Sequence, residues 1–401
     1  MALDVVRVRR DFPALALNVA HFDGPGGSLV PRQVADAVAG TLVGGLANRG
    51  SVTAGERRAD AVVTGARAAV ADLLDCPPEC VVFARSMTQA TYDMARALAR
   101  QWRAGDEVVV TRLDHDANIR PWVSAAASAG ATVRWAEFDP ATGALPVDAV
   151  AAVLSPRTRL VAVTAASNLL GTRPDVAAIA EAAHAVGAAV YVDGVHLTPH
   201  AAVSLPALGA DYYACSPYKF FGPHHGLLAA PRPGLLEQVR PDKLRPSTDA
   251  IPERFELGTL PYELLAGTTA AVDFVADLGG AGGPSRRDRI TASMRQVEAH
   301  EEALFAGLLD GLAAIRGVTV HPAPAPRTPT ALFSVAGHSP QAVYEHLGAL
   351  GVNAPAGSFY AIEAAERLGL GAAGAVRAGI APYNDAADVD RLLAGVRELA
   401  R

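Results

Sequence analysis

The chain has 401 residues, half of them hydrophobic, and a formal net charge of −6 with both signs spread along its length. This length fits two or three lobes better than one simple core. No basic patch is interleaved with aromatic residues, and no apolar run reaches the roughly 18 residues of a membrane helix. We therefore expect no nucleic-acid partner and no membrane anchor.

The N-terminal sequence and the cysteines indicate the cellular compartment that we expect for the protein. The N-terminus has no apolar core of the kind found in signal peptides. The three cysteines, Cys76, Cys80 and Cys215, do not stand at metal-site spacing. We expect a cytoplasmic location and no metal centre, because free cysteines are typical of a reducing compartment.

Short β-branched runs alternate with alanine-rich stretches from about residue 80 to 230. This alternation predicts a mostly parallel seven-stranded sheet with helices on both faces, and such sheets bind ligands beyond the carboxyl ends of their strands. The predicted strands are Val81–Ala84, Glu107–Thr111, Thr132–Glu137, Arg159–Ala165, Ala189–Val192, Asp211–Cys215 and Gly226–Ala230. The predicted helices are Thr88–Arg100, Ile119–Ala129, Pro146–Leu154 and Asp175–Val186.

The glycine-rich segment from Leu278 to Pro284 is the clearest break in composition. The elements predicted beyond it are helices at 285–314, 340–350 and 386–400, and strands near 318–322, 331–335 and 375–380. We predict a large domain over residues 21–278 and a smaller C-terminal α+β domain over residues 285–401. An N-terminal arm, residues 1–20, is expected to join the small domain.

Lysine is rare in this chain, which has 33 arginines but only Lys219 and Lys243. Lysine can lose its proton and form a Schiff base with an aldehyde, which arginine cannot do. Lys219 follows a predicted strand, whereas Lys243 lies in a polar, proline-bounded stretch typical of a surface loop. Lys219 is our candidate amine nucleophile; the alternative is an ordinary lysine at an element boundary.

Pyridoxal 5′-phosphate (PLP) is an aldehyde cofactor that needs an amine, an acid beside its pyridine nitrogen, and phosphate donors. Asp193 ends an apolar strand 26 residues before Lys219 and is the candidate acid, although carboxylates followed by Gly are common in other α/β enzymes. Met87 and Thr88 open a predicted helix whose N–H groups could bind a phosphate, or they belong to a plain helix cap. Ser216 could add a hydroxyl group.

PLP also needs a flat side chain against its ring. His115 follows another predicted strand and is the candidate for this stacking. Two alternatives remain open: a histidine that makes a structural hydrogen bond, and an exposed histidine solvated between Asp114 and Asp116.

Seven motifs, in order and spacing, resemble those of the class V aminotransferase superfamily, in particular its cysteine desulfurase and selenocysteine lyase group, and most closely the cysteine desulfurase-like branch of that group. The resemblance runs from about residue 20 to residue 400. The motifs are His21-Phe-Asp-Gly-Pro-Gly-Gly, Asp114-His-Asp-Ala-Asn-Ile-Arg-Pro-Trp, Ala166-Ser-Asn-Leu-Leu-Gly-Thr, Asp193-Gly-Val-His, Ser216-Pro-Tyr-Lys-Phe-Phe-Gly-Pro-His, Phe255-Glu-Leu-Gly-Thr and Arg377-Ala-Gly-Ile-Ala-Pro-Tyr-Asn.

The resemblance implies the type I fold of PLP-dependent transferases and a homodimer with shared active sites. It also implies a role for each matched residue: Lys219 as the Schiff-base lysine, Asp193 as the pyridinium partner, His115 as the ring-stacking group, Met87, Thr88 and Ser216 as phosphate contacts, Thr259 as a contact to the neighbouring subunit's cofactor phosphate, and Asn168 with Arg377 as the grip on the substrate α-carboxylate.

The sequence departs from the desulfurase pattern at cofactor-contacting and sulfur-accepting positions. His196 stands where desulfurases have a Gln that touches the cofactor's ring oxygen, and Tyr218 stands where they have a His before the lysine. The loop that carries their nucleophilic Cys here reads Asn353-Ala-Pro-Ala-Gly-Ser-Phe-Tyr and contains no Cys.

From these residues we predict a PLP-dependent enzyme that acts on an α-amino acid. β-Elimination, as by a C–S lyase, is the preferred reaction, without a persulfide on the small-domain loop. Transamination and epimerisation are the alternatives. A non-catalytic scaffold with the same fold is the alternative from another class, and a nucleotide-binding α/β enzyme is disfavoured because no Gly-x-Gly-x-x-Gly turn follows the first strand.

Overall fold

The computed structural model describes residues 2–280 and 282–400. Met1, Ala281 and Arg401, which belong to the predicted arm, the predicted break and the predicted small domain, lie outside the described residues. None of the described helices is both long enough and apolar enough to cross a bilayer.

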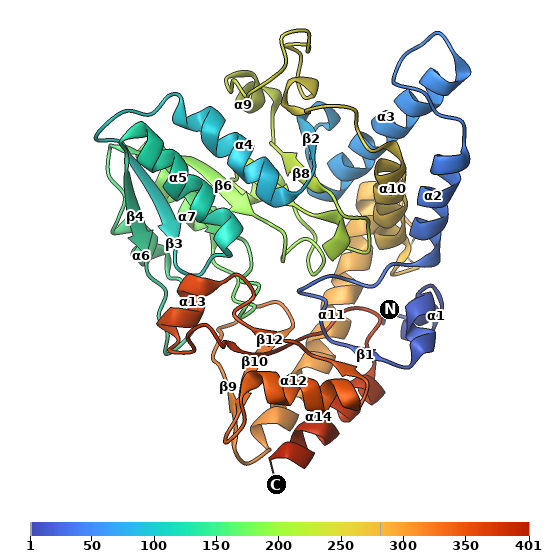
Figure 1. Ribbon diagram of the computed structural model, residues 1–401, viewed down its shortest axis with the longest axis vertical. Helices are drawn as coiled ribbons and strands as arrows, with labels where there is room; N and C mark the ends of the chain where they lie inside the picture. Colours follow the sequence, from blue (N-terminus) through green and yellow to red (C-terminus); the bar gives the residue numbers. More distant parts are fainter. Residues whose placement is uncertain (1, 281, 401) are drawn as a thin grey trace.

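The predicted mostly parallel, seven-stranded sheet is confirmed (Figure 1). Its strand order is β2-β8-β7-β6-β5-β3-β4, with β8 antiparallel to both of its neighbours. The strands are β2 (Val81–Ala84), β3 (Glu107–Thr111), β4 (Thr132–Ala136), β5 (Thr158–Thr164), β6 (Ala189–Asp193), β7 (Tyr212–Cys215) and β8 (Gly226–Ala229). Each observed strand end differs from the predicted one by at most one residue.

Helices cover both faces of this sheet, because strand side chains alternate between its two faces. Val109 packs in one hydrophobic layer with Val70, whereas Val108 and Val110 pack in the other layer with Trp122. The helices before residue 280 are α1 (Val5–Arg10), α2 (Arg32–Val43), α3 (Ala54–Leu74), α4 (Met87–Ala99), α5 (Arg120–Ala129), α6 (Val147–Ala151), α7 (Val176–Ala185), α8 (Leu205–Leu208), α9 (Pro233–Glu237) and α10 (Tyr262–Asp277).

Short 3-10 helices connect several of these elements. They are η1 (Pro13–Leu17), η2 (Pro78–Cys80), η3 (Asp116–Asn118), η4 (Pro217–Lys219) and η5 (Glu253–Phe255). Two of them, η3 and η4, directly follow the residues His115 and Ser216 at strand ends, and they therefore shape the edge of the sheet where a ligand is expected.

A second, four-stranded antiparallel sheet in the order β12-β13-β10-β9 forms after the 28-residue helix α11. It has its own hydrophobic core, which includes Phe333, Val376 and Leu392. The elements are α11 (Arg286–Ala313), β9 (Val318–Val320), β10 (Thr330–Val335), α12 (Pro340–Ala349), β11 (Val352–Asn353), β12 (Ala356–Gly357), α13 (Ile362–Arg367), β13 (Ala375–Gly379) and α14 (Ala386–Leu399). The predicted domain limits stay predictions.

The N-terminal segment runs beside this C-terminal part. Strand β1 (Ala20–His21) pairs in parallel with β11. Arg9 donates to Asp388 of α14 over 2.8 Å, and Figure 1 shows α1 close to the lower part of the molecule. These contacts support the proposal that the arm joins the small domain.

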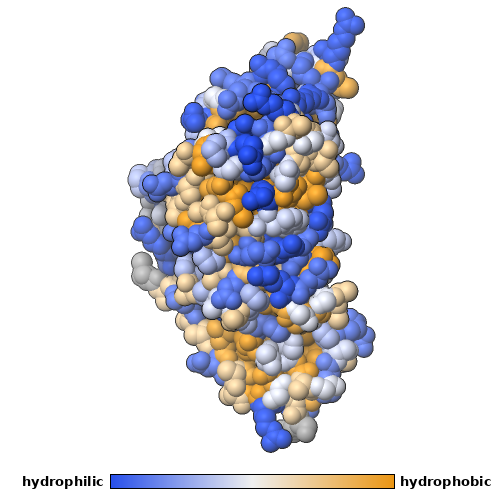
Figure 2. Space-filling view, turned by 90° about the vertical axis from the view of Figure 1, so that its left-hand side faces the viewer, coloured by the Kyte–Doolittle hydropathy of each residue, from blue (hydrophilic) through white to orange (hydrophobic). Residues whose placement is uncertain are grey.

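The face that carries β4 and α13 is mixed in character. Figure 2 shows a hydrophilic band that crosses this face between two more hydrophobic areas. Strand β4 forms the edge of the large sheet and is half exposed, and Arg134 in its middle places a charge on that edge. Charged residues on an edge strand discourage pairing with another chain.

Candidate active site

A cavity of about 750 Å³ takes its walls from both sheets. Most of its lining residues follow the carboxyl ends of parallel strands, where open α/β sheets bind ligands. The cavity brings together the predicted residues Met87, Thr88, His115, Asn168, Asp193, His196, Ser216, Tyr218, Lys219 and Arg377. Thr259 does not line it and is exposed.

Lys219 lies in η4, just after β7. Its Nζ donates hydrogen bonds to the backbone oxygens of Pro25 and Gly26, the latter over 2.9 Å. The amine also lies 4.8 Å above the centre of the Tyr218 ring. Burial, aided by the nearby Arg377 guanidinium, lowers the pKa of Lys219 to about 7, so a large share of this amine is unprotonated at neutral pH.

Asp193 ends β6 and is buried. Its Oδ1 accepts a hydrogen bond of 2.9 Å from the backbone N–H of Val195. Burial raises the pKa of Asp193 to about 6, although the positive charge of Lys219 lowers it. A cation placed against this carboxylate would favour its ionised form, because opposite charges attract strongly where water is excluded.

A second buried acid, Asp114, lies beside this site. Its carboxylate accepts hydrogen bonds from the hydroxyl of Thr111 and, over 2.7 Å, from Nδ2 of Asn118. Burial raises the pKa of Asp114 to about 8, and the charge of Asp193 raises it further. At neutral pH, Asp114 therefore favours its protonated form and adds little negative charge beside Asp193.

The N-terminus of α4 points its free N–H groups at the cavity wall. Ser86 caps this helix by accepting from Gln89 N over 3.0 Å, and Met87 and Thr88 form the first turn. Gly226 of β8 lies against this turn: a Cβ there would approach the Met87 nitrogen to 2.4 Å. The loop is thus held close to the sheet, with anion-binding N–H groups at the cavity.

His115 is half-buried and has a fixed orientation. Its Nδ1 accepts a hydrogen bond of 3.0 Å from Ala117 N, which leaves the proton of the neutral ring on Nε2. The imidazole stacks on the Tyr360 ring, with centroids 5.5 Å apart and planes at 28°. Burial lowers the pKa of His115 to about 4, and the ring is therefore neutral at pH 7.

Arg377 lies on β13 and is buried, with three partners around its guanidinium. It donates to Asp23 Oδ1 over 2.8 Å and to the backbone oxygen of Asn168 over 3.0 Å. The Phe359 ring stacks on it, with its centroid 3.7 Å from the guanidinium carbon. Asn168 Nδ2 donates to the backbone oxygen of Phe359 over 2.9 Å.

Sequence reasoning missed Asp23, Phe359 and Tyr360 as parts of the site. Phe359 and Tyr360 lie in the loop without a cysteine, and both have left-handed backbones, with φ of 53° and 57°. Consecutive left-handed residues other than glycine are costly, and they persist where surrounding contacts hold them. Here Tyr360 O accepts from Asp116 N over 2.8 Å, and Glu363 pairs with Arg112 and Arg120.

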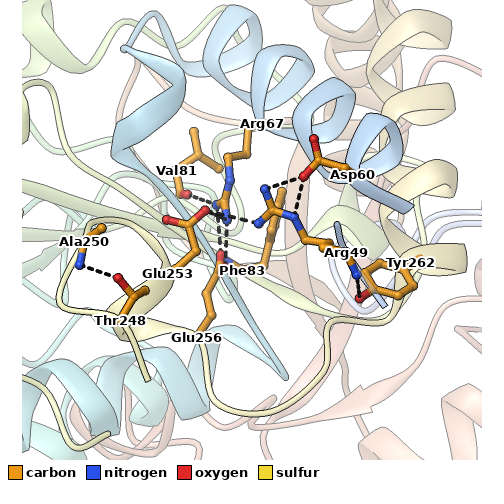
Figure 3. A network of polar contacts seen from close by, with 10 residues as sticks. All are labelled: Arg49, Asp60, Arg67, Val81, Phe83, Thr248, Ala250, Glu253, Glu256 and Tyr262. Atoms are coloured by element: carbon orange, nitrogen blue, oxygen red, sulfur yellow. Dashed lines mark hydrogen bonds and ion pairs between the residues drawn. The ribbon is translucent and has the colours of Figure 1, made fainter. Parts of the chain in front are cut away.

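A network of polar contacts anchors the segment just before Thr259, and Figure 3 shows Glu256 of this segment beside Arg67. Glu256 accepts from both terminal nitrogens of Arg67, over 2.9 and 2.7 Å, and from Phe83 N over 2.9 Å. The side chains of Arg67 and Glu256 are 8% and 4% exposed. This buried pair fixes the chain just before Thr259, whose own side chain faces outward.

Comparison with known proteins identifies the family. The aminotransferase class-V model matches residues 20–392. An uncharacterized protein of Mycobacterium tuberculosis is 34% identical, covering 100% of both chains. A probable cysteine desulfurase of Pseudomonas aeruginosa is 33% identical, covering 96% of this chain and 95% of that protein.

The structural comparison agrees with the sequence comparison. The structure is similar to that of the cysteine desulfurase CsdA of Escherichia coli, with a TM-score of 0.87 and 27% identity, covering 99% of this chain and 98% of that chain. This similarity extends over almost the whole of both chains and agrees with the mostly parallel sheet seen here. The chain therefore belongs to the class-V aminotransferase family and is a PLP-dependent enzyme of the cysteine desulfurase-like kind.

Proposed function

We propose that the enzyme eliminates a leaving group from Cβ of an α-amino acid, as a C–S lyase does, without passing sulfur to a cysteine of the 352–361 loop. The observation that carries this proposal is the content of the cavity. It combines Lys219, Asp193 and Arg377, and no cysteine among residues 2–280 and 282–400 lines it.

The residues of the cavity fit PLP. The α4 N–H groups and the Ser216 hydroxyl suit its phosphate, His115 offers a flat neutral ring, and Asp193 offers a buried acid for the pyridine nitrogen. Asn168 and Arg377, which line the cavity, each have a buried side-chain atom, Oδ1 and Nε respectively, with no hydrogen-bond partner in the described protein. Such atoms call for an occupant. When bound, PLP acts as an electron sink for negative charge at Cα.

Lys219 is the residue we assign to proton transfer at Cα. A base works best when its pKa lies near the working pH, and the pKa of Lys219 is lowered to about 7. In this role its ε-amine takes the Cα proton and holds it as an ammonium group. The leaving group then departs from Cβ with its bonding electrons, and the amino acid becomes an unsaturated product.

Arg377 is the residue we assign to the substrate α-carboxylate, with Asn168 beside it. A buried guanidinium binds a carboxylate strongly, because its charge is poorly screened and its N–H groups match the two oxygens. Phe359 covers one face of the guanidinium, so a carboxylate approaches along its edge. This contact fixes which end of the substrate faces Lys219.

The state of the three thiols supports elimination without a persulfide. Burial raises the pKa of Cys76 and of Cys80 to about 12, and it also raises the pKa of the fully buried Cys215. Sulfur acceptors react as thiolates, and a thiol with a raised pKa is a weak nucleophile at neutral pH.

Product analysis tests the proposal. The purified enzyme would be incubated with L-cysteine and other amino acids that carry a leaving group on Cβ. Elimination gives pyruvate and ammonia in equal amounts with the leaving group, whereas transfer of sulfur to a thiol leaves alanine. A keto acid that still carries its Cβ substituent would indicate transamination, and loss of optical activity alone would indicate epimerisation. A protein that binds no PLP and turns over no amino acid would be a scaffold.

We also propose a homodimer with shared active sites, in which Thr259 reaches the partner's cofactor phosphate. The support is the position of Thr259: it is exposed, lies outside the cavity of its own chain and follows a firmly anchored segment.

A further inference from the structure

The turn from Asp23 to Gly27 touches both functional cations of the cavity. Its Pro25 and Gly26 carbonyl oxygens accept hydrogen bonds from the Lys219 ε-amine, and the Asp23 carboxylate pairs with Arg377 over 2.8 Å. Carbonyl oxygens accept hydrogen bonds and donate none, so these contacts are made by N–H groups of Lys219. A neutral amine has two such donors and could make both bonds, but the bonds are stronger from the ammonium form because its positive charge assists them.

Hydrogen bonds and close packing hold the turn in one conformation. The N–H groups of Gly26 and Gly27 both donate to Asp23 O over 2.9 Å, and Gly26 N also donates to Asp23 Oδ1 over 3.1 Å. A Cβ at Gly26 would lie 2.3 Å from Asp23 Oδ2, and one at Gly379 would lie 2.4 Å from the Pro25 ring. Glycine at these two positions therefore lets the turn sit against its own carboxylate and against β13.

The turn is also tied to the segment that carries Lys219. Ser28 N donates to Tyr218 O over 3.0 Å, and the Ser28 hydroxyl donates to the same oxygen over 3.0 Å. The Ser28 hydroxyl in turn accepts from Phe221 N over 2.8 Å. These bonds fix the carbonyl oxygens of Pro25 and Gly26 relative to the backbone of Lys219. The free ε-amine therefore has a preformed pair of hydrogen-bond acceptors within its reach.

We propose that the Asp23–Gly27 turn is a holding site for the ε-ammonium group of Lys219 when this group is not attached to the cofactor. Asp23 is then a positioning residue that balances the Lys219 ammonium group against the Arg377 guanidinium. This inference rests on the proposed role of Lys219 as the cofactor lysine and the base at Cα.

The electrostatics of the cavity agree with this geometry. Burial and the Arg377 charge lower the pKa of Lys219, while the charges of Asp23 and Asp193 raise it. Asp23 thus opposes the effect of Arg377 in two ways, by its own charge and by neutralising the guanidinium that it binds. Loss of the Asp23 charge would therefore lower the pKa of Lys219, and loss of the Arg377 charge would raise it.

The arrangement has a consequence for substrate binding. A substrate carboxylate that binds Arg377 competes with Asp23 for the guanidinium, which leaves Asp23 freer to face the Lys219 amine. Binding of the carboxylate and protonation of Lys219 would then favour each other, as linkage requires of two coupled sites. The coupling would therefore help Lys219 to hold the proton that it has taken from Cα while the carboxylate stays bound to Arg377.

The uptake of PLP by the cofactor-free full-length protein tests the proposal, because Schiff-base formation needs the unprotonated amine. The uptake rate would be followed by absorbance from pH 5.5 to 9 in wild type, Asp23→Asn, Arg377→Gln and a control, Asp36→Asn, on the exposed face of α2. A decrease of about one unit in the Lys219 pKa makes Asp23→Asn roughly fivefold faster than wild type at pH 6 and equal to it at pH 9. Arg377→Gln should be slower than wild type at pH 6.

The outcomes separate this inference from the function on which it rests. If borohydride fixes no PLP on Lys219 of the wild type, the proposed function fails. If PLP is fixed on Lys219 but the pH profile of Asp23→Asn overlays that of wild type, or moves the same way as that of Arg377→Gln, the holding site is wrong. Circular dichroism identifies any variant that fails to fold. Because the pH profiles of Asp23→Asn and Arg377→Gln should shift in opposite directions, either variant alone still tests the proposal.

Discussion

The ε-amine of Lys219 is held between carbonyl oxygens and charges of both signs, and this balance determines its reactivity. Lys219→Ala should abolish the absorbance of the Schiff base between PLP and the protein and lower turnover by about 10²–10⁴-fold, the usual contribution of one acid–base group. The measurements are the visible spectrum and the rate of product release. Retention of full activity by Lys219→Arg would contradict the proposed role, because arginine cannot form a Schiff base.

Lys243 provides the matched control for this prediction. Its Nζ donates to Ser247 O over 2.8 Å and lies 3.3 Å from Asp249, in a surface loop outside the cavity. Lys243→Ala should therefore leave both the spectrum and the turnover unchanged.

The cysteines allow a second prediction at the scale of single residues. Replacing Cys76, Cys80 and Cys215 together by Ser should leave the turnover of the true substrate within about twofold, because no step of the proposed elimination uses a thiol. Since Cys215 is fully buried, thermal stability would be measured in parallel. Loss of turnover in a variant that keeps its fold and PLP, or a persulfide mapped to Cys215, would restore the desulfurase mechanism.

Part of the site could be read from the sequence, because Asp193 ends a short apolar strand and His115 lies four residues after the end of another. The motifs also identified the family, and the comparisons confirm this. Asp23 could not be assigned in this way: its partner Arg377 is 354 residues away. The left-handed pair Phe359 and Tyr360 has no local signature either, because contacts with Asn168 and Asp116 hold it in place.

The anchored segment before Thr259 permits a prediction about an element. Glu256→Gln should lower the free energy of unfolding by about 3 kcal/mol, because it leaves the buried Arg67 without its main counter-charge. Asp60→Asn, which removes an exposed partner of Arg49 in the same network, should cost less than about 1 kcal/mol. Urea unfolding of the PLP-loaded proteins measures both. Equal losses in the two variants would show that Arg67 does not depend on Glu256.

The length of an element did not decide whether it was predicted, because the 21-residue helix α3 and the 16-residue helix α10 were not among the predicted elements. Strand β3 contains three consecutive Val residues and β5 a Leu-Val-Ala-Val stretch, and both were located within one residue. The two-residue strands β11 and β12 were missed, because each is defined by pairing with a distant strand, β1 or β13. Helix α13, which has only six residues, was missed as well. Its residue Glu363 forms ion pairs with Arg112, which follows β3, and with Arg120, which begins α5.

The whole molecule places the cavity where three parts of the chain meet. The large sheet supplies Lys219 and Asp193, the C-terminal sheet supplies Arg377, and the segment after β1 supplies Asp23 (Figure 1). Movement of the C-terminal sheet would therefore separate the proposed carboxylate site from the proposed base. Glu363 and Tyr360 of the C-terminal part make contacts with Arg120 and Asp116 that hold these parts together.

The proposed dimer, with its shared active sites, can be tested by mixing variants of the whole protein. If Thr259 serves the partner's cofactor, Thr259→Ala should weaken PLP retention by roughly ten- to hundredfold, the effect of one lost hydrogen bond to a charged group. Mixing Thr259→Ala with Lys219→Ala should form hybrid dimers that contain one site with Lys219 from one chain and Thr259 from the other. That site should retain PLP as wild type does, which equilibrium dialysis would measure. Sedimentation of the wild type should show a dimer, and a fully active, PLP-loaded monomer at low concentration would refute the shared site.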